Sequence, residues 1–176
     1  MTSNLFDLTG KVALITGGTH GIGMAIGKTL GQAGARICVN DLSPERLEAA
    51  KIEYAKAGVD VFTLVFDVTD EQQVDEGISV IEREVGPVDI LVNNAGMQHV
   101  APIEEFPLEK FELLVRIMLF APFIALKRAF YVKAAAGEYL QSKGLNVELD
   151  LQVFGYGDAY NQKVNTALAS GEAFDI

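Results

Sequence analysis

The stretch from Lys11 to Gly23, which reads KVALITGGTHGIG, limits the possible folds more than any other part of the chain. It opens with the continuous apolar run from Val12 to Ile15, and such a run is typical of a strand covered on both faces in a parallel sheet. A glycine-rich turn follows, and an amphipathic run begins at Met24. Glycines let a backbone approach a pyrophosphate closely, and a helix N-terminus offers unpaired N–H groups and the positive end of its dipole. The stretch therefore predicts a phosphate-binding turn between a strand and a helix.

A glycine cluster alone could also be a tight turn that binds nothing. The buried strand before it and the helix after it favour the nucleotide site. The residues that this interpretation assigns to the turn are Gly17, Thr19, His20, Gly21, Ile22 and Gly23.

Strands and helices alternate along the next part of the chain. The pattern predicts strands over 12–16, 36–40, 60–66 and 88–92, and helices over 21–33 and 44–56. A third helix follows a capping box formed by Thr69 and Gln72 and ends before Gly86. Right-handed crossovers between such strands give a parallel sheet with helices on both faces. The predicted fold is a single α/β domain, a three-layer doubly wound Rossmann-like parallel sheet of five to six strands.

Polar residues follow the predicted strands at their carboxyl ends, which is where ligands bind in folds of this kind. Gly17, Asp41, Asp67 and Asn93 all fall there. We expect them to lie along one edge of the sheet.

A fourth helix is predicted to begin near Pro107, with Phe111, Leu114, Val115 and Met118 on its core face. Apolar and helical character continues to about residue 142. One straight helix of that length would measure roughly 50 Å. We therefore expect a kink or break near Pro122 or Gly137.

Composition excludes several classes of function. The 176 residues carry a formal net charge of −10, which argues against binding to nucleic acid and against binding to anionic membranes. The single cysteine, Cys38, cannot form an internal disulfide, and its apolar strand predicts a buried thiol. The first ten residues lack the pattern of a signal peptide, and no apolar run reaches membrane-spanning length, so we expect a cytoplasmic protein.

Two motifs together resemble the short-chain dehydrogenase/reductase family. They are TGxxxGIG, starting at Thr16, and NNAG over Asn93–Gly96, and the resemblance covers residues 5 to 128. The sequence GGTHGIGMAI is similar to the gluconate 5-dehydrogenase branch. The resemblance implies that Asp67 and Val68 contact the adenine of a dinucleotide, and that Asn93, Ala95 and Gly96 border the cofactor. Asp41 stands where the family selects the cofactor, and a carboxylate there favours the ribose 2′-hydroxyl of NAD over the 2′-phosphate of NADP. The alternative for Asp41 is a turn residue before a helix.

The pattern of apolar and polar residues changes after residue 134. Residues 145–154 alternate between apolar and polar, which predicts a half-covered edge strand beside the one over 88–92, followed by a helix to about Ala169 and a short strand at 174–176. The segment 134–176 resembles the start of a sugar-type solute-binding protein of an ABC importer. In the first resemblance, Met118 stands where the family has Asn, which suggests a repacked core. Together these features suggest an engineered chimera, with residues 1–130 binding the dinucleotide and 131–176 grafted on; a truncated natural chain is the weaker explanation.

The short-chain family transfers hydride with a Tyr, a Lys and a Ser. Tyr139 and Lys143 match YxxxK by count but precede the alternating strand, and Tyr156, Tyr160 and Lys163 have the wrong spacing. We therefore assign no catalytic residue. His20 lies in the glycine turn and His99 could line the nicotinamide pocket, and two histidines far apart predict no metal site.

Three functions remain open. The main reading is a chimera that binds NAD weakly, chiefly through its adenine half, and catalyses nothing. The alternatives are an NAD-dependent short-chain oxidoreductase acting on a sugar acid or hydroxy acid, and a partial carbohydrate-binding fragment. A small-molecule dinucleotide is the only partner that the sequence predicts, and the oligomeric state is open.

Overall fold

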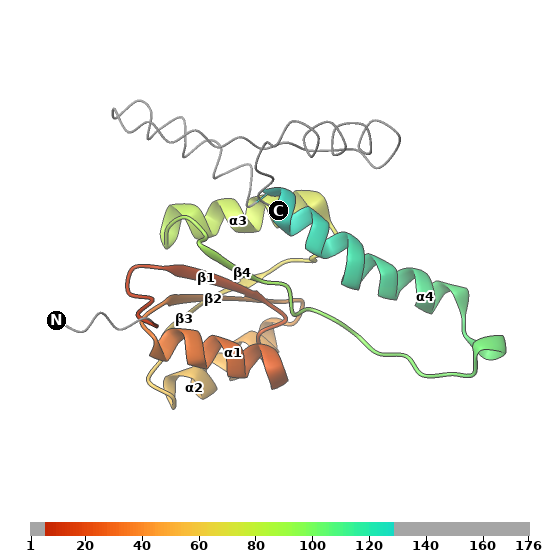
Figure 1. Cartoon of the computed structure of the whole chain (residues 1–176), viewed down its shortest axis with the longest axis horizontal. Coiled ribbons are helices and arrows are strands. Elements are labelled where there is room, and N and C mark those ends of the chain that lie inside the picture. Colours follow the sequence, from red (N-terminus) through yellow and green to blue (C-terminus); the bar gives the residue numbers. More distant parts are fainter. Residues whose placement is uncertain (1–5, 129–176) are drawn as a thin grey trace, which may run out of the picture. The chain divides into compact units, whose positions relative to one another are not determined.

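A four-stranded parallel sheet forms the centre of the protein. The structure, a computed structural model, describes residues 6–128. The strands are β1 (Val12–Thr16), β2 (Arg36–Asp41), β3 (Val61–Val65) and β4 (Ile90–Val92), and they lie in the order β3-β2-β1-β4. In the register, Leu14 of β1 pairs with Cys38 on one side and Leu91 on the other. Every strand runs the same way, so all four carboxyl ends meet at one edge of the sheet (Figure 1).

Helices cover both faces of this sheet. Helices α1 (Gly21–Gln32) and α2 (Pro44–Ala55) lie on one face, and α3 (Glu71–Glu84) and the helical turns over 121–128 lie on the other (Figure 1). Helix α4 (Leu108–Val115) leads into those turns and holds no buried residue. This arrangement confirms the predicted three-layer, Rossmann-like α/β fold. The further strands predicted at 145–154 and 174–176, and the pairing of the first with β4, lie outside the described residues.

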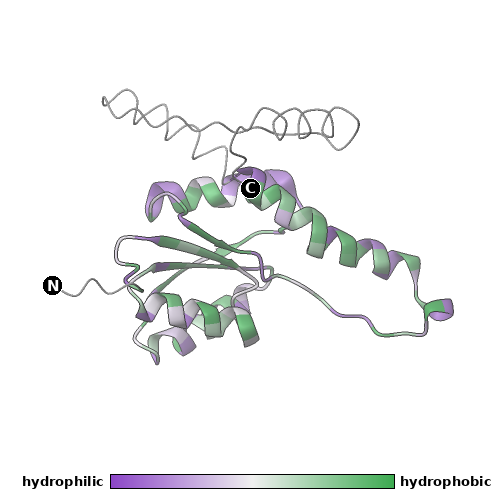
Figure 2. Ribbon diagram, viewed as in Figure 1, coloured by the Kyte–Doolittle hydropathy of each residue, from purple (hydrophilic) through white to green (hydrophobic). Residues whose placement is uncertain are grey.

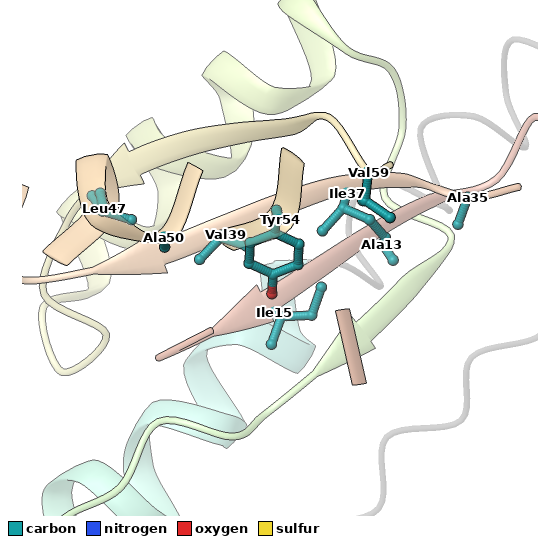
Figure 3. Close-up of a cluster of buried hydrophobic side chains, with 9 residues drawn as sticks. All are labelled: Ala13, Ile15, Ala35, Ile37, Val39, Leu47, Ala50, Tyr54 and Val59. Atoms are coloured by element: carbon teal, nitrogen blue, oxygen red, sulfur yellow. The ribbon is translucent and has the colours of Figure 1, made fainter. Parts of the chain in front are cut away.

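The core consists of one apolar cluster on each face of the sheet. The apolar side chains of the strands alternate between the two clusters, because successive residues of a strand point to opposite faces. Toward α1 and α2 the cluster holds Ala13, Ile15, Ala35, Ile37, Val39, Leu47, Ala50, Tyr54 and Val59 (Figure 3). Toward α3 it holds Val12, Leu14, Cys38, Phe66, Val74, Ile78, Ile81 and Val88. Burying each Ile or Leu side chain contributes about 1.5–3 kcal/mol, so these two clusters fix the sheet and with it the edge where the site lies.

Two helix N-termini show how local sequence sets the element bounds. Ser43 caps α2 by accepting a hydrogen bond from the Arg46 N–H at 3.2 Å, and Pro44 is the first helical residue, as predicted. The prediction that Thr69 and Gln72 form a capping box at the start of α3 was wrong. Asp70 caps α3 and accepts from the N–H groups of Gln72 and Gln73, because its carboxylate reaches two N–H groups of the first turn.

The helix after Pro107 changes its winding. Helix α4 ends at Val115, a π-helical turn covers Arg116–Phe120, and α-helical turns continue over 121–128. In the π-turn the Ala121 N–H donates to the Arg116 carbonyl, five residues back. Pro122 follows directly, and its missing N–H removes the donor that would continue the regular ladder. The predicted interruption near Pro122 is therefore a π-turn; the alternative at Gly137 lies outside the described residues.

The predicted core face of this helix was wrong at two of its four positions. Phe111 and Met118 are 54% and 59% exposed, Leu114 and Val115 are half-buried, and Ala121 and Ala125 are buried. The residues from 117 to 126 are all apolar and appear green in Figure 2, so their spacing could not identify the inner face. The exposure of Met118 also overturns the repacked core that we inferred from its replacing an Asn.

Candidate functional site

The glycine turn between β1 and α1 has the backbone shape that its sequence predicts. Gly17 and Gly21 have positive φ angles of 61° and 57°, a region that other residues rarely adopt. The Gly17 N–H donates to the Asn40 carbonyl at 2.8 Å, which ties the turn to the end of β2. A Cβ on Gly17 would lie 3.0 Å from the Cα of Ala95, so the turn and the segment after β4 pack too closely for a side chain.

The start of α1 offers donors without acceptors. His20 is the N-cap residue but makes no capping hydrogen bond with its side chain, and the first turn holds no acidic residue. Among the described residues, the N–H groups of Gly21, Ile22 and Gly23 have no acceptor. Three such N–H groups at the positive end of a helix dipole suit a phosphate. The residues present therefore fit the pyrophosphate of a dinucleotide.

The amide of Asn94 holds this turn in place. Its Nδ2 donates to the carbonyls of Thr16 at 3.0 Å and Gly17 at 2.9 Å. The Thr16 hydroxyl in turn accepts from the N–H groups of Asn94 and Ala95, each at 3.1 Å. A Cβ on Gly23 would collide with the Asn94 amide, so α1 can approach only because that position is glycine. These contacts join the carboxyl ends of β1 and β4.

Asp41 lies at the end of β2 with several donors around its carboxylate. Its side chain is 6% exposed. Oδ2 accepts from the Thr19 hydroxyl at 2.6 Å, and Oδ1 accepts from the Ser43 N–H at 3.0 Å. The Thr19 hydroxyl also lies 3.1 Å from Nδ1 of His20, and because its one proton goes to Asp41, Nδ1 is the donor in that contact. The structure therefore brings Asp41, Thr19 and His20 together in one hydrogen-bonded chain.

Asp67 lies at the next strand end along the same edge. Its Oδ1 accepts from both the N–H and the hydroxyl of Thr69 at 2.8 Å. Its Oδ2 has no hydrogen-bond partner among the described residues. This half-buried oxygen and the neighbouring Val68 form one wall of the site, with one hydrogen-bond acceptor and one apolar side chain.

A cavity of about 320 Å³ runs along this edge of the sheet. Nine of the predicted cofactor residues line it: Gly17, His20, Gly21, Ile22, Asp41, Asp67, Val68, Ala95 and Gly96. Thr19 and Gly23 do not line it but support residues that do. Asn93 lies instead beside a small apolar void between the sheet and residues 117–125.

Other residues of the cavity were missed. Asn40, Leu42, Arg46, Phe66, Asn94 and Ile117 also line it. Of these residues, Arg46 was the easiest to predict from the sequence, because it lies in the first turn of a helix that begins three residues after Asp41. Ile117 could not be found, since it reaches the cavity from the π-turn after α4 through a tertiary contact.

His99 does not line this cavity and packs edge-on against Phe106, with ring centroids 5.1 Å apart. Its place in a nicotinamide pocket stays a prediction. Within residues 6–128 no three His, Cys, Asp or Glu side chains gather as metal ligands would. In the same residues, no helix has the length and apolarity needed to cross a bilayer. Tyr139, Lys143, Tyr156, Tyr160 and Lys163 lie outside the described part of the chain.

Comparisons with known proteins agree with this geometry. The family model for short chain dehydrogenases matches residues 11–138, more than half of the chain. An uncharacterised oxidoreductase of Bacillus subtilis is 50% identical over 120 residues, which are 68% of this chain and 47% of that protein. The 2-dehydro-3-deoxy-D-gluconate 5-dehydrogenase of Formosa agariphila is 42% identical over 152 residues, which are 85% of this chain and 58% of the relative. The chain thus spans about half the length of the curated relatives that it matches.

A solved structure is similar as well. The gluconate 5-dehydrogenase of Burkholderia cenocepacia, crystallised with NADP and tartrate, superposes with a TM-score of 0.68 at 36% identity. The match covers 75% of this chain and 52% of that one.

These matches overturn the interpretation of the chain as an inactive chimera. The alignment with the Formosa enzyme covers 85% of the chain, so it must extend past residue 134 wherever it begins. The family match likewise continues to residue 138, beyond the seam that we expected before residue 134. The resemblance of 134–176 to a solute-binding protein rested on short motifs, whereas the relatives described above are dehydrogenases or oxidoreductases. The fold, the cavity and these matches lead to one conclusion: this chain belongs to the short-chain dehydrogenase family.

Proposed function

We propose that the chain forms the dinucleotide-binding part of an NAD-dependent short-chain oxidoreductase that acts on a sugar acid. The observation that supports this most directly is the start of α1, where the N–H groups of Gly21, Ile22 and Gly23 have no acceptor among the described residues. Gly21 and Ile22 line a cavity of about 320 Å³. The same cavity is lined by carboxylates at the ends of β2 and after β3. This combination of N–H donors and carboxylate acceptors suits a dinucleotide, which has a negatively charged pyrophosphate and neutral riboses with hydroxyl donors.

The proposed residue roles follow from the chemistry of each group. The N–H groups of Gly21, Ile22 and Gly23 bind the pyrophosphate. Asp41 accepts hydrogen bonds from the adenosine ribose, and Oδ2 of Asp67 accepts from the adenine amino group. The bound NAD supplies the hydride acceptor, and these residues hold it at the carboxyl edge of the sheet.

NAD is the preferred cofactor in this proposal. Asp41 is almost fully buried and negatively charged, so it attracts a ribose 2′-hydroxyl and repels a 2′-phosphate. The related Burkholderia enzyme was crystallised with NADP, and we therefore expect NAD to be favoured without NADP being excluded.

The substrate class rests on the relatives. One curated relative is a 2-dehydro-3-deoxy-D-gluconate 5-dehydrogenase, and the solved structure is a gluconate 5-dehydrogenase. Both names describe the oxidation of a hydroxyl on a sugar acid. We propose the same substrate class here.

Calorimetric titration of NAD into the chain tests the site. We expect saturable binding, and replacement of Gly23 by Ala should abolish it. If millimolar NAD gave neither heat of binding nor a thermal shift, the proposed dinucleotide site would be wrong.

Turnover is tested separately, by following NADH absorbance with gluconate and with 2-dehydro-3-deoxy-D-gluconate. Loss of turnover in the variant Tyr139→Phe, with NAD binding unchanged, would identify Tyr139 as the acid–base group that we did not assign. Turnover unchanged in that variant would support leaving Tyr139 unassigned.

A further inference from the structure

Arg46 places a positive charge directly beside the cofactor-selecting carboxylate. Its Nη2 lies 2.8 Å from Oδ1 of Asp41. The arginine side chain is 55% exposed, whereas that of Asp41 is 6% exposed. Arg46 is thus the solvent-facing member of the pair, and it lines the same cavity as Asp41.

Asp41 does not depend on Arg46 for its hydrogen bonds. The Thr19 hydroxyl and the Ser43 N–H continue to donate to its two oxygens if the guanidinium moves away. The buried carboxylate therefore keeps two donors, which lowers the penalty for separating it from the guanidinium. An ion pair with one half-exposed member is also weak, because water competes for the guanidinium.

The backbone of Arg46 fixes where the side chain can reach. Its N–H donates to the Ser43 hydroxyl at 3.2 Å in the first turn of α2, whose N-terminus adjoins the cavity. The guanidinium carries several N–H donors in one plane, which suits two oxygens of a phosphate. A small rotation of the side chain would exchange the Asp41 oxygen for such a group.

We propose that Arg46 sets how strongly the site discriminates between NAD and NADP. With NAD, Arg46 stays paired with Asp41, and the carboxylate accepts from the ribose. With NADP, Arg46 leaves Asp41, binds the 2′-phosphate and offsets its repulsion from the carboxylate. This inference rests on the proposed dinucleotide function. It adds that the difference in affinity between NAD and NADP is small, because Arg46 can bind the 2′-phosphate.

Calorimetric titration of the full 176-residue chain with NAD and, separately, NADP tests the inference. The variant Arg46→Gln keeps a good helix former but removes the charge. We expect it to weaken NADP binding about tenfold or more while NAD affinity stays within about threefold, since a charge-assisted contact to phosphate is lost only for NADP. NADP affinity of the wild type should also fall more steeply with added salt than that of the variant.

The matched control is Arg83→Gln. Arg83 is also an exposed arginine in an ion pair, with Glu84 at 2.8 Å, but it lies on α3 and does not line the cavity. We expect neither affinity to change in this control. The variant Arg46→Lys, which keeps the charge, should recover part of the NADP affinity.

Three results would overturn the inference. If Arg46→Gln weakens both dinucleotides equally, the guanidinium supports the Asp41 carboxylate without discriminating between the two cofactors. If it leaves NADP binding unchanged, the guanidinium does not reach the 2′-phosphate. If the wild type binds neither dinucleotide, the proposed function fails, and this inference fails with it.

Discussion

The phenol of Tyr54 donates a hydrogen bond of 3.0 Å to the carbonyl of Gly18, and this contact joins α2 to the glycine turn through the interior. Tyr54 is fully buried. Its ring lies over the strands that carry Ile15 and Val39 (Figure 3). The turn is therefore held from the interior of the protein by a side chain that does not line the cavity.

Replacing Tyr54 by Phe should lower stability and weaken NAD binding. The Gly18 carbonyl would lose its buried donor, at a cost of about 1 kcal/mol in the free energy of unfolding. The turn would be less firmly placed, and we expect NAD affinity to fall a few-fold. Urea unfolding and calorimetry measure the two effects. An unchanged affinity beside the expected loss of stability would show that Tyr54 does not position the turn.

The burial of Tyr54 also leads us to expect that the free energy of unfolding falls at alkaline pH. Burial raises the pKa of the Tyr54 phenol to about 12, because the charged phenolate is disfavoured in apolar surroundings. In the unfolded chain the pKa is about 10. The contribution of Tyr54 is thus fully present below pH 10 and is lost as pH rises toward 12, by about 1.4 kcal/mol at pH 11. The pKa of Cys38 is also raised to about 12 by burial, but this thiol is present in both proteins.

Urea unfolding at pH 8 and pH 11 isolates the phenol when wild type is compared with Tyr54→Phe. The wild type should be the more stable at pH 8, and its advantage should vanish near pH 11. A constant difference across this range would contradict the raised pKa.

Replacing Gly23 by Ala should remove dinucleotide binding. The added methyl group would collide with the Asn94 amide and with the Gly17 carbonyl, so α1 would shift away from the turn. Such overpacking costs about 1–3 kcal/mol. The control Gly31→Ala adds a methyl group to the same helix but against Val59, away from the turn. It should lower stability while leaving NAD affinity within a few-fold, and equal losses of affinity in both variants would argue that helix packing in general controls binding.

Replacing Asn94 by Asp should also damage the site. The amide donates to two carbonyls, and a carboxylate there would face them as a third acceptor. We expect a loss of about 1–3 kcal/mol in stability and weaker NAD binding. The neighbouring Asn93→Asp is the control, because Asn93 is exposed and makes neither contact. If thermal unfolding and calorimetry gave the same values for both variants, the assigned role of Asn94 would be wrong.

Local patterns predicted the fold well. The apolar runs, glycine turns and Ser43 cap located every element up to β4, because each depends on neighbouring residues alone. The buried residues after α4 could not be predicted, since the run over 117–126 is entirely apolar and tertiary contact alone decides which of its side chains are buried. The chimera was inferred from short motifs, and similarity over most of the chain overturned it.

The site was predicted only in part, for a similar reason. Residues that lie at strand ends, such as Asp41 and Asp67, follow directly from topology. Asn94 and Tyr54 matter through contacts made across 77 and 36 positions of sequence, and no spacing rule connects them to the turn. Arg46, five positions after Asp41, was within reach of a local pattern.

Three glycines of α1, one turn apart, each accommodate a different side chain: Asn94 at Gly23, Tyr54 at Gly27 and Val59 at Gly31. A Cβ at any of the three would overlap its partner. The two sides of each contact can therefore change during evolution only together, and a relative with alanine at the middle position should carry a smaller residue in place of the tyrosine. Aligned sequences of the family would reveal this as three independent pairs of covarying columns.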